Sequence, residues 1–320
     1  MFAGCNALLP NEIRPVEALP ISPRNPRGAN VGYQNVTIPA QQYTMIGVNF
    51  QAVAGGSLSI QDIFPDPLGQ GITGSKTAKA AGTANADVFM YWDPTDKGKY
   101  VTLYVCNDTS KPDKYNKWCV QTINTELTTD QQAYWGTRDT VVDKNLPAGQ
   151  GMWLYRPVYA TELQLTMSGA ATVAQSGLQI PVRGNGGYTM FCTGFTTAFA
   201  PNPDVAGTGP AIDWLGISGF VGSKTAKAAG TAGADVLMYW DPTDKGKYVT
   251  LYVCNDTSKP DKYNKWCVQT INTELTAEQQ ASWGTRDTVV SRTIPAGQAV
   301  WWMRPSSTDL VVTIPQPYSL

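Results

Sequence analysis

The chain has 320 residues, of which 42% are apolar and 15% are charged, and its 24 Lys and Arg nearly balance 25 Asp and Glu. This length suits two domains with buried cores, and a near-neutral chain without a basic block argues against nucleic acid as a partner. Histidine is absent, which removes serine triads, Cys–His dyads and His-ligated zinc, so we expect neither an enzyme nor a cofactor. No apolar run reaches the about 20 residues that a membrane-spanning helix needs.

Residues 1–30 are predicted to form an extended N-terminal arm, because proline interrupts both helices and central strands. The prolines of this segment are Pro10, Pro15, Pro20, Pro23 and Pro26. The arm is either a disordered leader or a segment that docks on the sheet edge of a neighbouring subunit. It lacks the basic and apolar regions of a signal peptide, so either the chain is not exported or its leader has already been removed.

A long internal repeat follows the arm. Residues 74–142 recur at 222–290, with an offset of 148 and five differences. The differing pairs are Asn85/Gly233, Phe89/Leu237, Thr129/Ala277, Asp130/Glu278 and Tyr134/Ser282. A period of this length indicates two whole domains in tandem rather than a solenoid. We expect repeat 1 to span residues 31–172 and repeat 2 to span residues 173–320, with the flanks of each unit more divergent.

Within each repeat the dominant period is two, which predicts short strands. In repeat 1 we expect strands at 87–92 and 100–105, joined by a hairpin loop. Asp93 and Asp96, with carbonyls near Gly98, could chelate calcium there. Their spacing does not match an EF-hand loop, so a plain Asx-rich hairpin is the favoured interpretation.

One short helix is expected in each repeat. In repeat 1, Thr128 and Gln131 have the spacing of a capping box and Gly136 ends the run. A tail strand is predicted at 162–167. Many short strands with one helix predict an all-β fold of two tandem antiparallel β-sandwich-like domains.

The six cysteines fall into two groups. Four bracket a polar loop that is identical in the two repeats; the pairs are Cys106 with Cys119 and Cys254 with Cys267. Because no metal-ligand set accompanies them, we expect each pair to form a local disulfide in an exported protein, the alternative being reduced thiols in the cytosol. Cys5 and Cys192 remain, and we favour their pairing, within a chain or as a staple between the arm and another subunit.

Other residues are candidates for surface chemistry. Asn35, Asn107 and Asn255 begin Asn-x-Thr triplets and are candidate glycosylation sites. Trp118 and Trp266 lie beside the loop cysteines, where they either pack in the core, which we favour, or face a glycan ligand.

Three carboxylates keep an enzyme among the alternatives. Glu126, Asp130 and Asp139 would support glycoside hydrolysis only if two of them faced each other in a cleft. Both repeats carry this set, with Asp130 replaced by glutamate in repeat 2, so nothing marks a unique catalytic centre.

Short motifs link residues 31–320 to a known pattern. They are Val36-Thr37-Ile38-Pro39-Ala40, Tyr43-Thr44-Met45-Ile46-Gly47, Met90-Tyr91-Trp92-Asp93, the segment 146–153 and the closing Gln316-Pro317-Tyr318. The chain thereby resembles secreted tandem β-repeat surface proteins of verrucomicrobial and related bacteria, although the cysteine-bracketed loop is not part of their pattern. The resemblance implies export to the cell surface and β-sandwich units, and it implies no activity.

These observations favour an extracellular structural protein that assembles with copies of itself into a surface filament, sheath or layer. Tandem near-identical domains give one chain two equivalent docking surfaces, and contacts that do not close produce a filament. The alternative is a secreted carbohydrate-binding or adhesive protein with two equivalent binding domains, whose partners are glycans.

Overall fold

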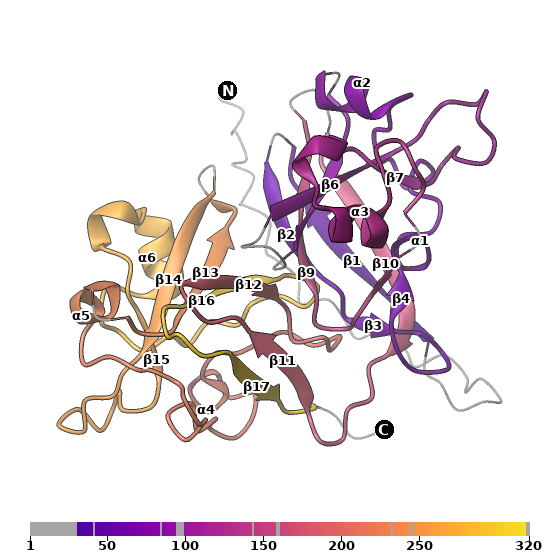
Figure 1. Cartoon of the computed structure of the whole chain (residues 1–320). Coiled ribbons are helices and arrows are strands. Elements are labelled where there is room, and N and C mark those ends of the chain that lie inside the picture. The colour runs from indigo at the N-terminus through magenta and orange to yellow at the C-terminus, as the bar shows by residue number, and fades with distance from the viewer. Residues whose placement is uncertain are drawn as a thin grey trace, which may run out of the picture.

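The computed structural model describes residues 31–40, 42–83, 85–93, 99–142, 144–157, 161–231, 233–243 and 246–317. These residues form antiparallel strands with a few short helices (Figure 1), which confirms the all-β class. The expected arm at 1–30 lies outside the described residues. Among the helices that are described, none combines the length and apolar character needed to cross a membrane.

Each repeat contains a five-stranded antiparallel sheet. In repeat 1 its order is β2 (Tyr43–Gly47), β9 (Gly151–Tyr155), β5 (Val88–Asp93), β6 (Lys99–Val105) and β7 (Trp118–Val120). In repeat 2 the equivalent order is β12 (Gly187–Phe191), β16 (Val300–Arg304), β13 (Val236–Asp241), β14 (Lys247–Val253) and β15 (Trp266–Val268). The expected strands at 87–92 and 100–105 are therefore confirmed as β5 and β6.

Smaller sheets complete the repeats. Repeat 1 has β1 (Val31–Ile38), β10 (Leu163–Ala171) and β3 (Phe50–Gln51) in one sheet, and β4 (Leu58–Ser59) with β8 (Asn145–Leu146) in another. Repeat 2 has β11 (Leu178–Val182) paired with β17 (Leu310–Ile314). The predicted tail strand is thus β10, which pairs along the whole of β1.

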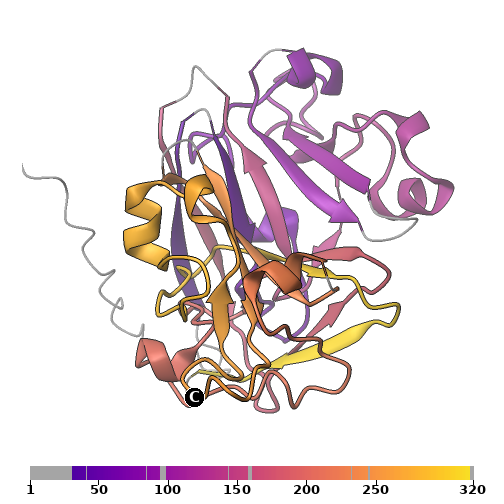
Figure 2. The same cartoon turned by 90° about the vertical axis from the view of Figure 1, so that its left-hand side faces the viewer.

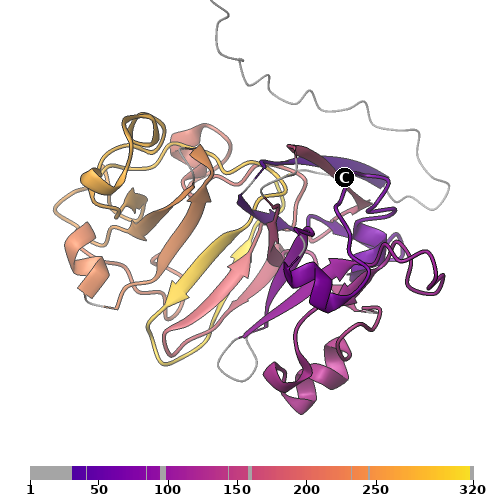
Figure 3. The ribbon, with the colours of Figure 1, turned by 90° about the horizontal axis from the view of Figure 1, so that it is seen from above.

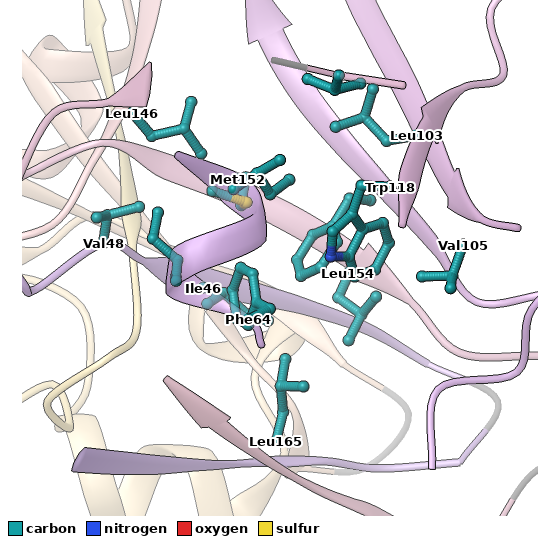
Figure 4. Packing of buried hydrophobic residues seen from close by; sticks show 14 of the residues in the cluster. Ile46, Val48, Phe64, Leu103, Val105, Trp118, Leu146, Met152, Leu154 and Leu165 are labelled. Atoms are coloured by element: carbon teal, nitrogen blue, oxygen red, sulfur yellow. The ribbon is translucent and has the colours of Figure 1, made fainter. Parts of the chain in front are cut away.

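The large and small sheets of repeat 1 enclose one hydrophobic core. Alternate residues of the large sheet, such as Leu103 and Leu154, point inward and meet Leu165 from β10. Figure 4 shows these side chains around Trp118. Repeat 2 builds an equivalent core. This arrangement agrees with the predicted β-sandwich, because period-two strands bury one face against another sheet.

Short helices cover parts of both repeats, and the expectation of one helix per repeat is wrong. The predicted helices are α3 (Thr129–Trp135) and α6 (Ala277–Trp283), each with the expected capping box. The others are α1 (Ile60–Ile63), α2 (Ala78–Thr83), α4 (Pro203–Ala206), α5 (Ala226–Thr231) and the 3₁₀ turns η1 (Asn124–Glu126) and η3 (Asn272–Glu274). The sequence of α2, Ala-Lys-Ala-Ala-Gly-Thr, has too little periodicity to reveal a helix that packs through small side chains.

A buried ion pair joins the closing strand to the start of the central strand in each repeat. Arg156 Nη1 lies 2.6 Å from Asp87 Oδ2, and Arg304 Nη1 lies 2.7 Å from Asp235 Oδ2. Removing one partner of such a pair costs about 3–5 kcal/mol, because it leaves a buried charge uncompensated. The pairs therefore fix the register of the sheets at their ends, a role the sequence analysis did not identify.

Candidate functional site

The two repeats pack against each other through a contact with approximate two-fold symmetry. Gly47 N–H donates to the carbonyl of Gly297 at 2.8 Å, and Cys192 N–H donates to the carbonyl of Gly149 at 2.8 Å. Gly47, the last residue of β2, is equivalent to Cys192, which directly follows β12, and Gly149 and Gly297 are equivalent turn positions before β9 and β16. Each contact thus occurs twice with the repeats exchanged, as in an isologous dimer, and this face is closed to further copies.

Cys192 lies in this contact, which corrects the expected staple. Its thiol is free and buried, and Cys5 lies outside the described residues. A side chain at the equivalent Gly47 has no room, since an added Cβ would lie 2.3 Å from the Cβ of Cys192. Burial raises the pKa of Cys192 to about 12, so the thiol stays protonated and is a poor nucleophile. It is a packing residue here.

Four tryptophans form the floor of the contact. Trp92 of repeat 1 packs edge-on against Trp301 of repeat 2, with ring centroids 5.6 Å apart. The equivalent pair with the repeats exchanged, Trp240 and Trp153, lies at 5.7 Å. All four lie on the outer faces of the large sheets, between the repeats.

Four tyrosines extend this cluster to the surface. Tyr43, Tyr100, Tyr188 and Tyr248 remain 42, 38, 42 and 37% exposed. Each packs against a tryptophan of the floor, for example Tyr100 on Trp92 at 4.9 Å and Tyr188 on Trp301 at 5.9 Å. We call these eight residues the aromatic seam.

The aromatic seam carries no formal charge near neutral pH. Burial raises the pKa of Tyr248 to about 12, although a hydrogen bond from Trp301 acts in the opposite direction. Burial likewise raises the pKa of Tyr100. The neighbouring Lys247, at the start of β14, is not part of the seam, and its Nζ donates to the carbonyl of Glu274 at 3.2 Å. The seam therefore presents aromatic side chains and neutral hydroxyl groups.

The symmetry of the seam breaks at one indole. Trp92 Nε1 donates to the carbonyl of Tyr188 at 3.1 Å. The equivalent Trp240 Nε1 is buried and has no hydrogen-bond partner among the residues that the structure describes. Trp240 also lines a recess of about 10 Å³, partly open to solvent, with Thr44, Met45, Tyr239, Pro242 and Gln298.

The predicted disulfides are not formed. Cys106, Cys119, Cys254 and Cys267 are free, buried thiols. In repeat 1, Cys119 faces Tyr104 in the β6–β7 register, so Cys106 is its diagonal neighbour. Diagonal residues lie about 7–8 Å apart, beyond the Cα separation of about 4.4–6.8 Å that a disulfide spans.

The thiols instead pack against the short helices. Cys106 and Cys119 contact Ala78 and Ala81 of α2, and repeat 2 has the same cluster. Burial raises the pKa of Cys119 to about 12, so this thiol stays protonated. The cysteine pattern therefore no longer argues for export.

Trp118 and Trp266 do not face a ligand. Each is fully buried at 0% exposure, and Figure 4 shows Trp118 within the core of repeat 1. Trp118 packs at 4.5 Å from Phe89, and Trp266 packs at 5.7 Å from Trp302. The favoured alternative, core packing, is confirmed.

The polar loops between β6 and β7 and between β14 and β15 are exposed and well braced. We name residues 107–117 end loop 1 and residues 255–265 end loop 2. In end loop 1, Asn116 Nδ2 donates to Asp66 Oδ1 at 2.6 Å, and Lys114 Nζ donates to the carbonyl of Asp139 at 2.7 Å. End loop 2 repeats both bonds at 2.9 and 2.7 Å. Tyr115 is 42% exposed in one loop, and Tyr263 is 41% exposed in the other.

The candidate glycosylation sites are accessible. Asn107 and Asn255 are exposed at the start of the end loops. Asn35 is exposed on β1, where its side-chain oxygen accepts from Thr166 Oγ1 at 2.8 Å. Glycosylation at these positions stays a prediction.

The candidate calcium loop has its first carboxylate engaged elsewhere. Asp93 is buried and accepts from Trp135 Nε1 at 3.2 Å, and Asp96 lies outside the described residues. In repeat 2, Asp241 accepts from the backbone N–H of Thr243 at 3.0 Å, which is the Asx-type turn that the sequence favoured. The part of the chain that is described contains no cluster of three or more side chains suited to a metal.

The carboxylates considered for glycoside hydrolysis have different surroundings. Asp139 Oδ1 accepts from the backbone N–H of Ala78 at 2.7 Å and from the hydroxyl of Tyr104 at 2.6 Å. It therefore caps α2. Glu126 and Asp130 are exposed, in η1 and in the first turn of α3.

Comparisons of the chain with protein-family models, with curated proteins and with solved structures find no match. The resemblance to verrucomicrobial-type surface proteins therefore stays a prediction.

Proposed function

We propose that the chain is a non-catalytic structural subunit that assembles with copies of itself through its end loops, outside the cell. The observation that carries this proposal is one braced loop with one exposed tyrosine at each of two ends. A molecule with two separate docking surfaces joins two neighbours, and contacts that do not close extend into a filament or layer.

The approximate two-fold axis sets the direction of these ends. Helices α2 and α3 lie on one side of the molecule, and α5 and α6 lie on the other (Figures 1, 2 and 3). Each end loop belongs to the same side as the helices of its own repeat, because it is braced by residues of that repeat. The ends therefore point away from the contact that the repeats share.

The sequences of the two ends support a shared partner. All eleven residues of end loop 1 recur in end loop 2, whereas the opening segments of the repeats, before residues 74 and 222, have largely diverged. Core packing accounts for identity at buried positions only. Identity at exposed positions such as Tyr115 and Tyr263 is the expected result when both loops meet the same surface.

Charge makes an end-to-end contact between copies feasible. Each end loop carries both signs, with Asp113 and Lys117 exposed in end loop 1. Asp108 and Lys111 are paired within the loop at 3.2 Å. A surface that offers both an acid and a base can pair with its own copy, and braced loops lose little conformational entropy on binding.

Electron microscopy and light scattering of the full chain test the proposal. We expect regular filaments or layers from the wild-type protein and monomers from the Tyr115→Ala/Tyr263→Ala variant. The single Tyr115→Ala variant keeps only the exposed tyrosine of end loop 2. It should therefore form dimers but no larger assemblies. Tyr134→Ser, which introduces the residue of repeat 2 at an exposed position, is the matched control and should assemble.

A wild-type protein that stays monomeric at high concentration would contradict the proposed assembly. The proposed location now rests on the sequence resemblance, since the thiols are free, and fractionation of the source cells tests it. Finding the chain only in the cytosolic fraction would overturn that part.

A further inference from the structure

We propose that the aromatic seam is a binding site for a neutral oligosaccharide, a role independent of the assembly proposed for the end loops. Its most exposed members are four tyrosines, each between 37 and 42% exposed. A sugar ring lays its C–H face on an aromatic ring, while its hydroxyl groups bond to nearby polar atoms. Tyrosine supplies both a ring face and a hydroxyl group.

The size of the seam favours a short ligand over a second copy of the chain. A tyrosine contributes about 150–250 Å² when fully buried, so four rings that are about 40% exposed offer about 250–400 Å². A stable interface between proteins buries about 800 Å² on each partner. The seam is therefore too small for a protein contact of its own and suits a few sugar units.

The charge of the seam favours a neutral ligand. Its eight residues are tyrosines and tryptophans, which are uncharged near neutral pH, and burial raises the pKa of Tyr100 and Tyr248 further. Nothing in this set pairs with a sulfate, a phosphate or a uronate group. An uncharged glycan meets ring faces and hydroxyl groups without leaving a charge uncompensated.

The unpartnered indole of Trp240 places one sugar hydroxyl. Its Nε1 is buried without an acceptor in the described part of the chain, whereas Trp92 Nε1 at the equivalent position donates to the carbonyl of Tyr188. A buried donor without an acceptor is unfavourable, and a ligand oxygen at this site would satisfy it. The adjoining recess of about 10 Å³ is far smaller than usual ligand pockets of about 300–1,000 Å³, so it holds at most one hydroxyl oxygen.

Calorimetric titration of the full chain tests the site. The probes are cellohexaose, mannohexaose, xylohexaose and chitohexaose, with hexagalacturonate as the charged comparison. We expect at least one neutral probe to bind and the charged probe not to bind. Tyr43→Ala/Tyr248→Ala should weaken binding at least about tenfold by removing two stacking rings.

Two further variants sharpen the test. Trp240→Phe keeps a ring but removes the N–H donor, and we expect it to weaken binding about three- to tenfold. Tyr134→Ser, an equally exposed tyrosine position outside the seam, should bind as the wild type does. Electron microscopy of the Tyr43→Ala/Tyr248→Ala variant separates this proposal from the proposed assembly. This variant should still form filaments, because its end loops are unchanged.

Three outcomes overturn the inference. They are the absence of binding to every neutral probe, undiminished binding by the Tyr43→Ala/Tyr248→Ala variant, and a wild-type dimer that this variant abolishes. Unchanged affinity of Trp240→Phe overturns the placement of a sugar hydroxyl at the indole. Loss of filaments in the end-loop variants with retained sugar binding leaves the site intact.

Discussion

At the scale of single residues, the contact between the repeats depends on one asymmetric pair. Gly47 and Cys192 are equivalent positions that meet near the approximate two-fold axis. Only one of them can carry a side chain, because two would occupy the same space. This explains why a cysteine occurs at this position in repeat 2 alone, which the sequence analysis interpreted as a bond to Cys5.

Gly47→Ala should destabilise the protein by about 1–3 kcal/mol, the usual cost of overpacking a filled site. Cys192→Gly should leave a small cavity. The double variant Gly47→Ala/Cys192→Gly exchanges the roles of the two positions and should recover most of the loss. Urea unfolding of the three variants measures the coupling, and strictly additive effects would contradict a direct contact.

At the scale of elements, local sequence signals determine where α3 and α6 begin and end. Thr128 Oγ1 accepts from Gln131 N–H at 3.2 Å, while Gln131 Oε1 accepts from Thr128 N–H at 3.1 Å. The cap satisfies donors that the first turn leaves open, and Gly136 ends the helix at a φ of 94°. In contrast, α2 has only a single local cap, in which Thr77 Oγ1 accepts from Ala80 N–H at 3.2 Å, and it also depends on the distant Asp139, which accepts from Ala78 N–H.

Thr128→Ala should lower the free energy of unfolding by about 1 kcal/mol, because it removes a capping oxygen. Thr129→Ala, which introduces the residue found at the equivalent position of repeat 2, is the matched control and should change it little. Thermal unfolding measures both. An equal loss in the two variants would show that the cap is not responsible.

At the scale of the whole molecule, the two repeats each have a core of their own and pack against each other through a third cluster of buried residues. The isologous contact buries Trp153 and Trp301 to 5 and 4% exposure. It also uses up the one pair of equivalent faces that lies between the repeats. Any assembly must therefore use other surfaces, which is why the end loops carry the proposed function.

Trp301→Ala should destabilise both repeats together. Removing a buried tryptophan costs about 3–5 kcal/mol, and this ring packs on Trp92 of the other repeat as well as on Tyr188 of its own. We expect one calorimetric transition in the wild type and one at lower temperature in the variant. Two transitions, with only one shifted, would mean that the repeats unfold separately.

The sequence by itself determined the all-β class, the tandem repeat, strands β5 and β6, and the capped helices, because strand period and capping spacing act over a few neighbouring residues. Only the tertiary structure decided which aromatic residues are exposed. Trp118 and the seam tyrosine Tyr100 both occur in strand-like runs, yet one is in a core and the other on the surface. Strand alternation assigns the two faces of a sheet, but what covers each face depends on residues distant in sequence. The same holds for the thiols, whose spacing suggested a disulfide until the register made them diagonal neighbours.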